Sequence, residues 1–434
     1  MRNQVSCRGT RPPGVAMQSG TDCASRGKDA RINLLRGRNF MSIKAQYAGL
    51  ATGLVSMATV FGAAPAAHAL DFKISGQVNR AVIAADNGKS TDAGLVDNGS
   101  SPTRFAFKGS QDVNPNLKVG FDYEIAVFVN KSGTYDINKG ATGTSTDNRQ
   151  AYAFFQGNYG KLRFGKTDGA ANSTSKVDLS GLTDLGGGSV VDDYFGGLSF
   201  VNGNGGTVGL SSGYSNFDAL SRQNTVRYDS PSFNGATLSI SYDQGQAIEV
   251  APRYEHKFAN GVKVAAAVDY VDSGNQKKDI NQAGVVKQNQ YFHEFGGSAS
   301  VLLPSGLNFF AQYKRRNYHD TYYDSGKFIS QDHAQSYSGG IGYIRGKNHI
   351  QAFFGQTDDL QSSNSQVRNY GVAYRYDLLK SVNMYASYHH LTGDNLASYT
   401  PVTNGSGDQV GTSVGSFGAK NMNVVFAGVR VKFF

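Results

Sequence analysis

The sequence predicts an all-β fold, a transmembrane antiparallel β-barrel of about 16 strands. Three observations support this prediction. Apolar and polar residues alternate along most of the chain after residue 70, which is the period of a strand with two different faces. Short turns alternate with long polar connections, as in barrels that span a membrane. No run of 18 apolar residues occurs in residues 70–434, so we expect no transmembrane helix there.

The N-terminal part of the chain reads as a leader. Residues 41–69 have the pattern of a secretory signal peptide: a lysine, a long apolar stretch and the Ala-His-Ala sequence at 67–69, which fits the small-x-small cleavage rule. The predicted mature chain therefore begins at Leu70 or Asp71. Residues 1–40 are basic and show no periodicity, and we interpret them as a mispredicted start upstream of the signal peptide.

The leader, residues 1–69, dominates the charge of the chain. The formal net charge is +9, but the leader alone holds nine Lys and Arg against two Asp. Residues 70–434, predicted to form a single barrel, hold 33 basic and 31 acidic residues, so the charge is no signal for nucleic-acid binding. Both cysteines, Cys7 and Cys23, lie in the leader, which excludes disulfides and cysteine metal sites from the barrel.

Alternation also predicts which side chains face water. In residues 118–129, for example, Phe121 and Tyr123 alternate with Asp122 and Glu124. A sheet that spans a membrane must close so that no backbone group is unpaired in lipid, and its two faces then meet acyl chains and water. We therefore expect Asp122 and Glu124 to line an aqueous lumen. A soluble β-sandwich would also alternate, but it seldom keeps short turns on one side and long loops on the other.

The spacing of turns gives the strand count. Seven short turns rich in Gly, Asn and Pro and eight longer connections separate the strands, which predicts sixteen of them. The longest connection covers residues 168–221. Because a long loop in a compact protein is usually functional, we expect this third loop to contribute to the site.

Four segments carry more specific motifs: SPTRFAFKGSQD at 101–112, QAYAFFQGNYGKLRFGK at 150–166, TDLGGGSVVDDYFGG at 183–197 and RQNTVRYDSPSF at 222–233. Together they resemble the general bacterial porin family of Gram-negative bacteria. The resemblance implies a homotrimer in the outer membrane, with the third loop folded into the lumen to narrow it. It also implies contact with lipopolysaccharide and the barrel-assembly machinery, and no nucleic-acid partner or cofactor.

A basic wall is expected inside the barrel. Where an aromatic or aliphatic side chain faces lipid, its neighbours in the strand point inward. We expect Tyr152 and Phe154 to face lipid, which would turn Arg149 inward. After the third loop, family position favours Arg222 on the wall, whereas alternation favours Arg227, and both are retained. The predicted wall comprises Arg104, Lys108, Arg149, Arg163, Arg222 and Arg227.

Acidic residues of the third loop are predicted to face this wall. Opposed charges across a narrow aqueous gap create a transverse field, which orients dipolar solutes and penalises apolar ones. Arginine suits this role because it keeps its charge at any working pH. The predicted loop acids are Asp178, Asp184, Asp192 and Asp193.

The C-terminal strand carries an expected assembly signal. Porins of this kind usually end in a single Phe preceded by alternating apolar residues. Val429, Val431 and Phe433 keep that alternation, and Phe434 adds one residue. Which of the two phenylalanines docks on the assembly machinery is open at this point.

Motifs that suggest catalysis do not hold. GKLRFGKT at 160–167 matches the phosphate-binding P-loop, but its interior alternates as a strand and no helical pattern follows. The nucleophile pattern at 209–213 lacks a strand–turn–helix context. We therefore predict no catalytic residue, metal or cofactor, and a channel for passive diffusion of small hydrophilic solutes. Mixed charges on the inner face favour a general pore. The alternatives are a solute-selective porin and an outer-membrane enzyme or adhesin.

Overall fold

The computed structural model describes residues 70–433 apart from 138, 140–142, 189, 275–276, 279–287, 290, 320–332 and 404–408. The predicted leader, residues 1–69, and Phe434 therefore lie outside the described residues. Within the described part, no helix is both long and apolar enough to cross a membrane.

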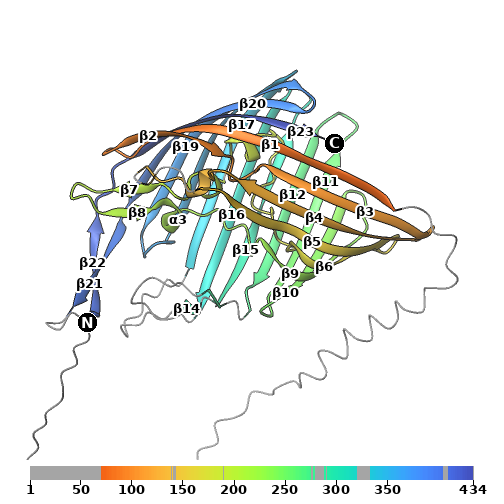
Figure 1. The fold of residues 1–434 in the computed structure, drawn as a ribbon, viewed down its shortest axis with the longest axis horizontal. Coiled ribbons are helices and arrows are strands. Elements are labelled where there is room, and N and C mark those ends of the chain that lie inside the picture. Colours follow the sequence, from red (N-terminus) through yellow and green to blue (C-terminus); the bar gives the residue numbers. More distant parts are fainter. Residues whose placement is uncertain are drawn as a thin grey trace, which may run out of the picture. The chain divides into compact units, whose positions relative to one another are not determined.

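Sixteen antiparallel strands form a closed ring, which confirms the predicted barrel (Figure 1). Each strand pairs with the next, and β1 pairs with β23 to close the sheet. A seventeenth strand, β2 (Thr91–Asp97), continues the line of β3 and pairs with the second half of β1. The ring consists of β1 (Asp71–Asp86), β3 (Arg104–Asn114), β4 (Leu117–Phe128), β5 (Ser145–Gly157), β6 (Gly160–Asp168), β9 (Arg222–Asp229), β10 (Ala236–Asp243), β11 (Ile248–Lys257), β12 (Lys263–Asp272), β15 (Tyr291–Leu302), β16 (Leu307–His319), β17 (His333–Arg345), β18 (Asn348–Asp358), β19 (Gln366–Leu379), β20 (Val382–Asp394) and β23 (Met422–Phe433).

The connections differ between the two ends of the barrel. One end carries short turns, which we call the turn end, and the other carries mostly longer segments, although residues 244–247 form a short link there. Among the described residues, three longer segments contain a pair of antiparallel strands of their own, and Figure 1 shows the β21–β22 hairpin extending beyond the barrel. These pairs are β7 (Ser199–Val201) with β8 (Thr207–Gly209), β13 (Lys277–Lys278) with β14 (Gln288–Asn289), and β21 (Leu396–Thr403) with β22 (Gln409–Phe417).

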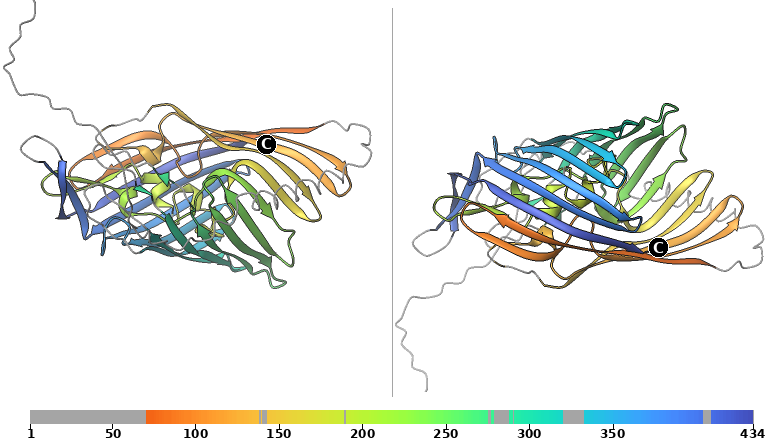
Figure 2. Two further views of the ribbon diagram at one scale, coloured as in Figure 1. Left: turned by 90° about the horizontal axis from the view of Figure 1, so that it is seen from below. Right: turned by 90° about the horizontal axis from the view of Figure 1, so that it is seen from above.

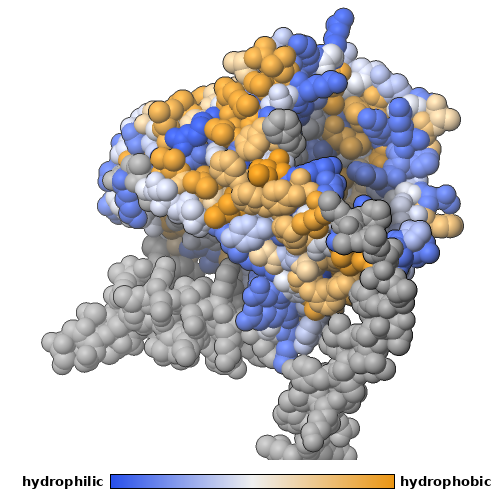
Figure 3. Space-filling view, turned by 45° about the vertical axis from the view of Figure 1, so that its right-hand side comes forward, coloured by the Kyte–Doolittle hydropathy of each residue, from blue (hydrophilic) through white to orange (hydrophobic). Residues whose placement is uncertain are grey.

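The outer face of the barrel is apolar. On β23, Val425, Val429 and Val431 are exposed, whereas Phe426 and Arg430 between them are buried, and β1 exposes Val78 and Val82 in the same way. Figure 3 shows apolar side chains gathered over the strands on one side of the molecule. An apolar exterior on a closed sheet is what contact with acyl chains requires.

A β-bulge interrupts the alternation in β5. Glu124 of β4 pairs with Gln150, but its neighbour Ile125 pairs with Asn148, so Arg149 is an extra residue on β5. A bulge places two residues of one strand opposite one of its partner, and it reverses the facing of every residue beyond it. The side chains of β5 therefore alternate in opposite phase on the two sides of Arg149.

This bulge corrects the prediction that Tyr152 and Phe154 face lipid. Tyr152 pairs with Asp122, and its hydroxyl donates to that carboxylate over 3.4 Å. Phe154 is the cross-strand partner of Arg163, which faces the lumen. Both aromatic rings therefore line the lumen. The prediction failed because alternation was extended through the bulge, although Arg149 itself does point inward.

The third loop, residues 169–221, folds into the barrel, as predicted. Figure 2 shows its short helices enclosed by the strands. Its largest apolar side chains pack on the inner wall: the ring centroid of Tyr194 lies 5.6 Å from that of Phe426 on β23, and Phe195 lies 5.5 Å from the same ring. The elements of the loop are η2 (Thr183–Leu185), α2 (Val191–Phe195), β7 (Ser199–Val201), β8 (Thr207–Gly209) and α3 (Leu210–Gly213); η1 (Ser132–Thr134) lies between β4 and β5.

Candidate functional site in the barrel lumen

Buried charges clamp the third loop to one side of the inner wall. Lys314 of β16 lies 2.6 Å from Asp269 and 2.8 Å from Glu294, and all three side chains are fully buried. The Glu294 carboxylate accepts a hydrogen bond from the backbone of Ala219 in the loop. On β11, Glu249 accepts one from the backbone of Ala171 at 2.7 Å. Both ends of the loop are thus held by wall carboxylates.

A second network lies within the loop itself. The ammonium of Lys176 lies 3.2 Å from Asp193 and 2.8 Å from Asp218, which joins the loop's beginning, tip and end. Burial opposes the charged form of Lys176, but the two carboxylates outweigh it and raise its pKa. Burial raises the pKa of Asp192 to about 7, and the neighbouring Asp193 adds to this effect. Asp193 therefore belongs to the ion-pair network of the loop, although 42% of its side chain is exposed, and Asp192 lies beside it.

Asp178 also has a local role in the structure. Its carboxylate accepts hydrogen bonds from Gln351 of β18 at 2.8 Å and from the hydroxyls of Ser180 and Thr183. These contacts tie the loop to the wall, and all the partners are neutral. Asp178 thus fixes the position of the segment that follows it.

Asp184 is the predicted loop acid that is exposed toward the basic wall. It lies in η2, whose flanking residues Thr183 and Leu185 are buried, so the backbone presents its side chain outward. It interacts electrostatically with Arg104 of β3 and with Arg430 of β23. Asp184 is therefore close enough to this part of the wall for its charge to act on both arginines.

The predicted basic wall on β3 and β5 carries its own carboxylates. Arg149 donates to Glu124 at 2.6 Å, and Arg104 lies 3.4 Å from the other oxygen of the same carboxylate. Lys108 lies 3.0 Å from Asp122. One acid shared by two arginines leaves an excess of positive charge at this level. Two basic residues thus share one acid at Glu124, whereas one basic residue pairs with one acid at Asp122.

The remaining predicted bases lie near the start and end of the third loop. Arg227 is buried, and it donates to the carbonyls of Asp168 and Gly169 at 3.0 and 2.7 Å, so it holds the entry of the loop. Arg222 pairs with Asp168 at 2.9 Å and interacts electrostatically with Arg104. Arg163 pairs with Asp229 at 2.9 Å. Arg222 and Arg227 therefore both contact the residues at which the third loop begins.

The whole arrangement is a polar path inside an apolar shell, narrowed by a fixed loop. In the described part of the chain, no group of three or more His, Cys, Asp or Glu side chains is placed to hold a metal ion. The family model described as Gram-negative porin matches residues 53–396, most of the chain. The chain belongs to the Gram-negative porin family. It is a multi-pass β-barrel of the outer membrane.

Comparisons with individual proteins agree with this assignment. The porin is 26% identical over 206 residues to outer membrane protein U of Vibrio cholerae; the match covers 44% of this chain and about half, 54%, of that relative. Its fold is similar to that of an anion-selective porin from Comamonas acidovorans, with a TM-score of 0.57 at 18% identity, covering 84% of this chain and 100% of the other. OmpT of Vibrio cholerae gives a TM-score of 0.53 at 13% identity, covering 86% and 100%.

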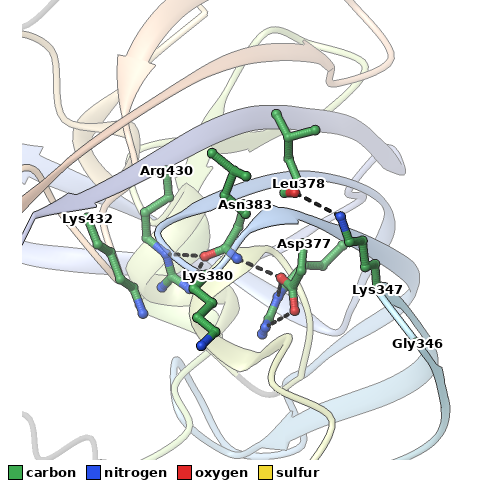
Figure 4. Close-up of a pocket in the computed structure, with 10 residues that line it drawn as sticks. Gly346, Lys347, Asp377, Leu378, Lys380, Asn383, Arg430 and Lys432 are labelled. Carbon is green, nitrogen blue, oxygen red and sulfur yellow. Dashed lines mark hydrogen bonds and ion pairs between the residues drawn. The ribbon is translucent and has the colours of Figure 1, made fainter.

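Sequence reasoning missed three cations of the porin's lumen. Arg430 and Lys432 of β23 face inward near the turn end (Figure 4). Arg375 of β19 also faces inward, since it donates to the carbonyl of Gly181 in the third loop. The signal was present, because Val429 and Val431 face outward and Arg430 lies between them. The prediction for the C-terminal strand considered the outward residues of the assembly signal and not the inward residues between them. At its end, the ring of Phe433 lies 5.8 Å from that of Phe105, which also faces outward.

Proposed function

We propose that this porin is a passive diffusion channel for small hydrophilic solutes and ions. The observation that carries the proposal is the placement of Asp184, on a loop fixed inside a closed barrel, in the electrostatic range of Arg104 and Arg430 on the wall. Sixteen strands enclose an aqueous lumen unless something fills it, and the third loop lies against part of the wall. A charged passage remains beside the loop.

The charges of this passage would act on solutes through a transverse field. Polar solutes can exchange their hydration for contacts with Arg104 and Asp184, whereas apolar ones lose hydration without compensation. The clamp at Lys314 and the network at Lys176 keep the loop in place, so the width of the passage is set by the fold. No chemical step is involved in this function, and the porin acts as a channel rather than as an enzyme.

A second candidate function is preference for anions. Arg104 and Arg149 share a single carboxylate, and Arg430 and Lys432 add further positive charge below them. The similar structure from Comamonas acidovorans is that of an anion-selective porin. A basic excess in the lumen would favour anions here too, which refines the expectation of a general pore with balanced charge.

Recording from the purified protein in planar bilayers tests both candidates. Stepwise increases in conductance are expected for a diffusion channel. The reversal potential under a salt gradient then gives the preference: a value on the anion side supports the second candidate, and a value near zero supports the general pore. A folded barrel that never conducts would contradict the proposed function.

Assembly and processing are proposed from the family. We expect a homotrimer, with lipopolysaccharide around it, and trimers should dissociate on heating in detergent. Crosslinking that yields monomers alone would exclude the trimer.

N-terminal sequencing of the membrane-extracted protein should give Leu70 or Asp71. Deleting Phe433 together with Phe434 should reduce the amount of assembled barrel, because Val429, Val431 and a terminal aromatic form the expected signal for the barrel-assembly machinery.

A further inference from the structure

A cavity of about 480 Å³ opens into the lumen at the turn end, between β19, β20 and β23 (Figure 4). Ligand pockets in proteins commonly have volumes of about 300–1,000 Å³, so this cavity can hold a small organic molecule. Basic residues dominate its lining, and we call the set the exit cluster. It consists of Lys347, Arg375, Lys380, Arg430 and Lys432, with Asp377 as the single acid.

The one acid of this cavity is already neutralised. Arg375 donates two hydrogen bonds to Asp377, from Nε to Oδ1 at 2.6 Å and from Nη2 to Oδ2 at 2.7 Å. The amide of Asn383 donates to the same carboxylate at 2.6 Å. A fork-to-fork pair of this kind satisfies the carboxylate and leaves it little capacity for further cations. The other four basic residues of the exit cluster therefore form no ion pair with Asp377.

Arg430 is the fixed cation of the cavity. Only 7% of this residue is exposed. Its Nε and Nη2 atoms donate to the amide oxygen of Asn383 at 3.1 and 2.8 Å, which orients the guanidinium without neutralising it. Among the described residues, no carboxylate forms an ion pair with Arg430, Lys380 or Lys432. A buried arginine held by a neutral partner is a preorganised donor for an incoming anion.

The remaining cations surround this arginine. Lys432 interacts electrostatically with Arg430 and Arg375, and these like charges repel one another. In Figure 4 the ammonium groups of Lys380 and Lys432 end in open space, with no interaction drawn to the other residues of the lining. Gathering like charges in one cavity is unfavourable unless a ligand of opposite charge relieves it. Asp184 of the third loop also attracts Arg430 and Lys432, but no acid pairs directly with Arg430, Lys380 or Lys432 among the described residues. A ligand with more than one negative charge would relieve the repulsion between them.

We propose that the exit cluster binds a small organic dianion of the dicarboxylate class. One carboxylate would accept a hydrogen bond from Nη1 of Arg430, and the other would lie between Lys380 and Lys432. Arg375 also donates to the carbonyl of Gly181 in the third loop at 2.7 Å, so a bound dianion would sit directly beneath the loop segment that leads to Asp184. The site rests on the proposed function, since it requires solutes to reach the cavity through the lumen.

Current recordings with succinate as the probe test the site. Succinate should reduce the conductance of the wild-type porin in a saturable way, with a lower half-saturating concentration from one side of the bilayer, whereas acetate should not saturate in the same range. The double variant Lys380→Gln/Lys432→Gln should raise the half-saturating concentration at least tenfold. The matched control Lys257→Gln/Lys263→Gln removes two lysines from the turn end of β11 and β12, and should change the half-saturating concentration less than twofold.

Different failures would have different meanings. Equal loss of succinate block in both double variants, or block by acetate at equal concentration, would overturn the site and leave a diffuse charge effect in a working channel. Absence of any conductance would overturn the proposed function instead. Calorimetric titration of succinate into the folded barrel in detergent decides the site without conduction: wild-type binding that the Lys380/Lys432 variant loses supports it, and no binding by wild type overturns it. Heat-dependent mobility on gels verifies that each variant is folded.

Discussion

The two sides of the inner wall both carry pairs of acidic and basic residues, but these pairs have different roles. On the clamp side, formed by β11, β12, β15 and β16, Lys314, Asp269 and Glu294 have no solvent exposure. On the pore side, formed by β3 to β6, Lys108 is 55% exposed although it also pairs with an acid. Charges in water are screened and interact weakly, whereas buried charges depend wholly on their partners. The clamp side therefore stabilises the loop, and the pore side presents a field to solutes.

The largest effect is expected from breaking the clamp. Lys314→Met would leave Asp269 buried without its ion-pair partner and Glu294 with Arg316 alone, and removing one partner of a buried pair typically costs about 3–5 kcal/mol. The temperature at which the folded band is lost on gels should fall markedly. Lys108→Met on the pore side is the matched control, and it should change this temperature little. Equal effects of the two variants would contradict the distinction between the two sides.

On the pore side, removing Arg104 and Arg149 together should change selectivity rather than stability. The double variant to alanine removes both basic partners of Glu124, so cation preference should rise by roughly two- to tenfold, since exposed pairs interact by about 1 kcal/mol or less. Reversal potentials under a salt gradient measure the change. Glu124→Gln is the complementary variant and should shift them toward anions. A fold-stable double variant with unchanged selectivity would place the narrowest point elsewhere.

A smaller shift is expected from the loop's own acid. Asp184→Asn removes one exposed negative charge opposite the basic wall, so the preference should move toward anions by less than about twofold. The shift should shrink between 0.1 and 1 M salt, because the Debye length falls from about 10 to about 3 Å. Asp178→Asn offers a control in the same loop, since that carboxylate has neutral partners. A larger shift from Asp178→Asn than from Asp184→Asn would reverse the assignment.

The smallest effect concerns pH and the loop network. The pKa of Asp192 is raised to about 7 by burial and by Asp193, whereas an unfolded aspartate titrates near pH 4. A raised pKa contributes stability that is complete below about pH 4 and is lost as the pH rises through 7. Loop packing should therefore loosen toward neutral pH, seen as more frequent current fluctuations, and Asp192→Asn should flatten this dependence. At Asp218 the ion pair with Lys176 outweighs burial and lowers the pKa. The stability that this carboxylate contributes is therefore lost only as the pH falls below about 4.

The alternation of apolar and polar residues was sufficient to predict much of the barrel, but it failed at particular residues. It predicted the ring of strands and the inward position of Arg104 and Lys108, because strand period depends on local chemistry. It failed at Tyr152, since nothing in the local sequence marks the bulge at Arg149. The partners of Asp192 and Asp193 were also out of reach. They depend on how Lys176, distant along the loop, folds back to pair with Asp193 and Asp218, which is a matter of tertiary packing.

The seam between β1 and β23 has a consequence for how the barrel forms. The two strands pair from Gly76 with Phe433 to Asp86 with Asn423, so the strand made early is completed by the strand made late. Contacts between such distant parts of a chain are slow to form, because a very long segment must be ordered first. Until β23 arrives, one edge of β1 has unpaired backbone groups, which lipid cannot satisfy. The chain must therefore remain sheltered from aggregation until its final strand has been delivered.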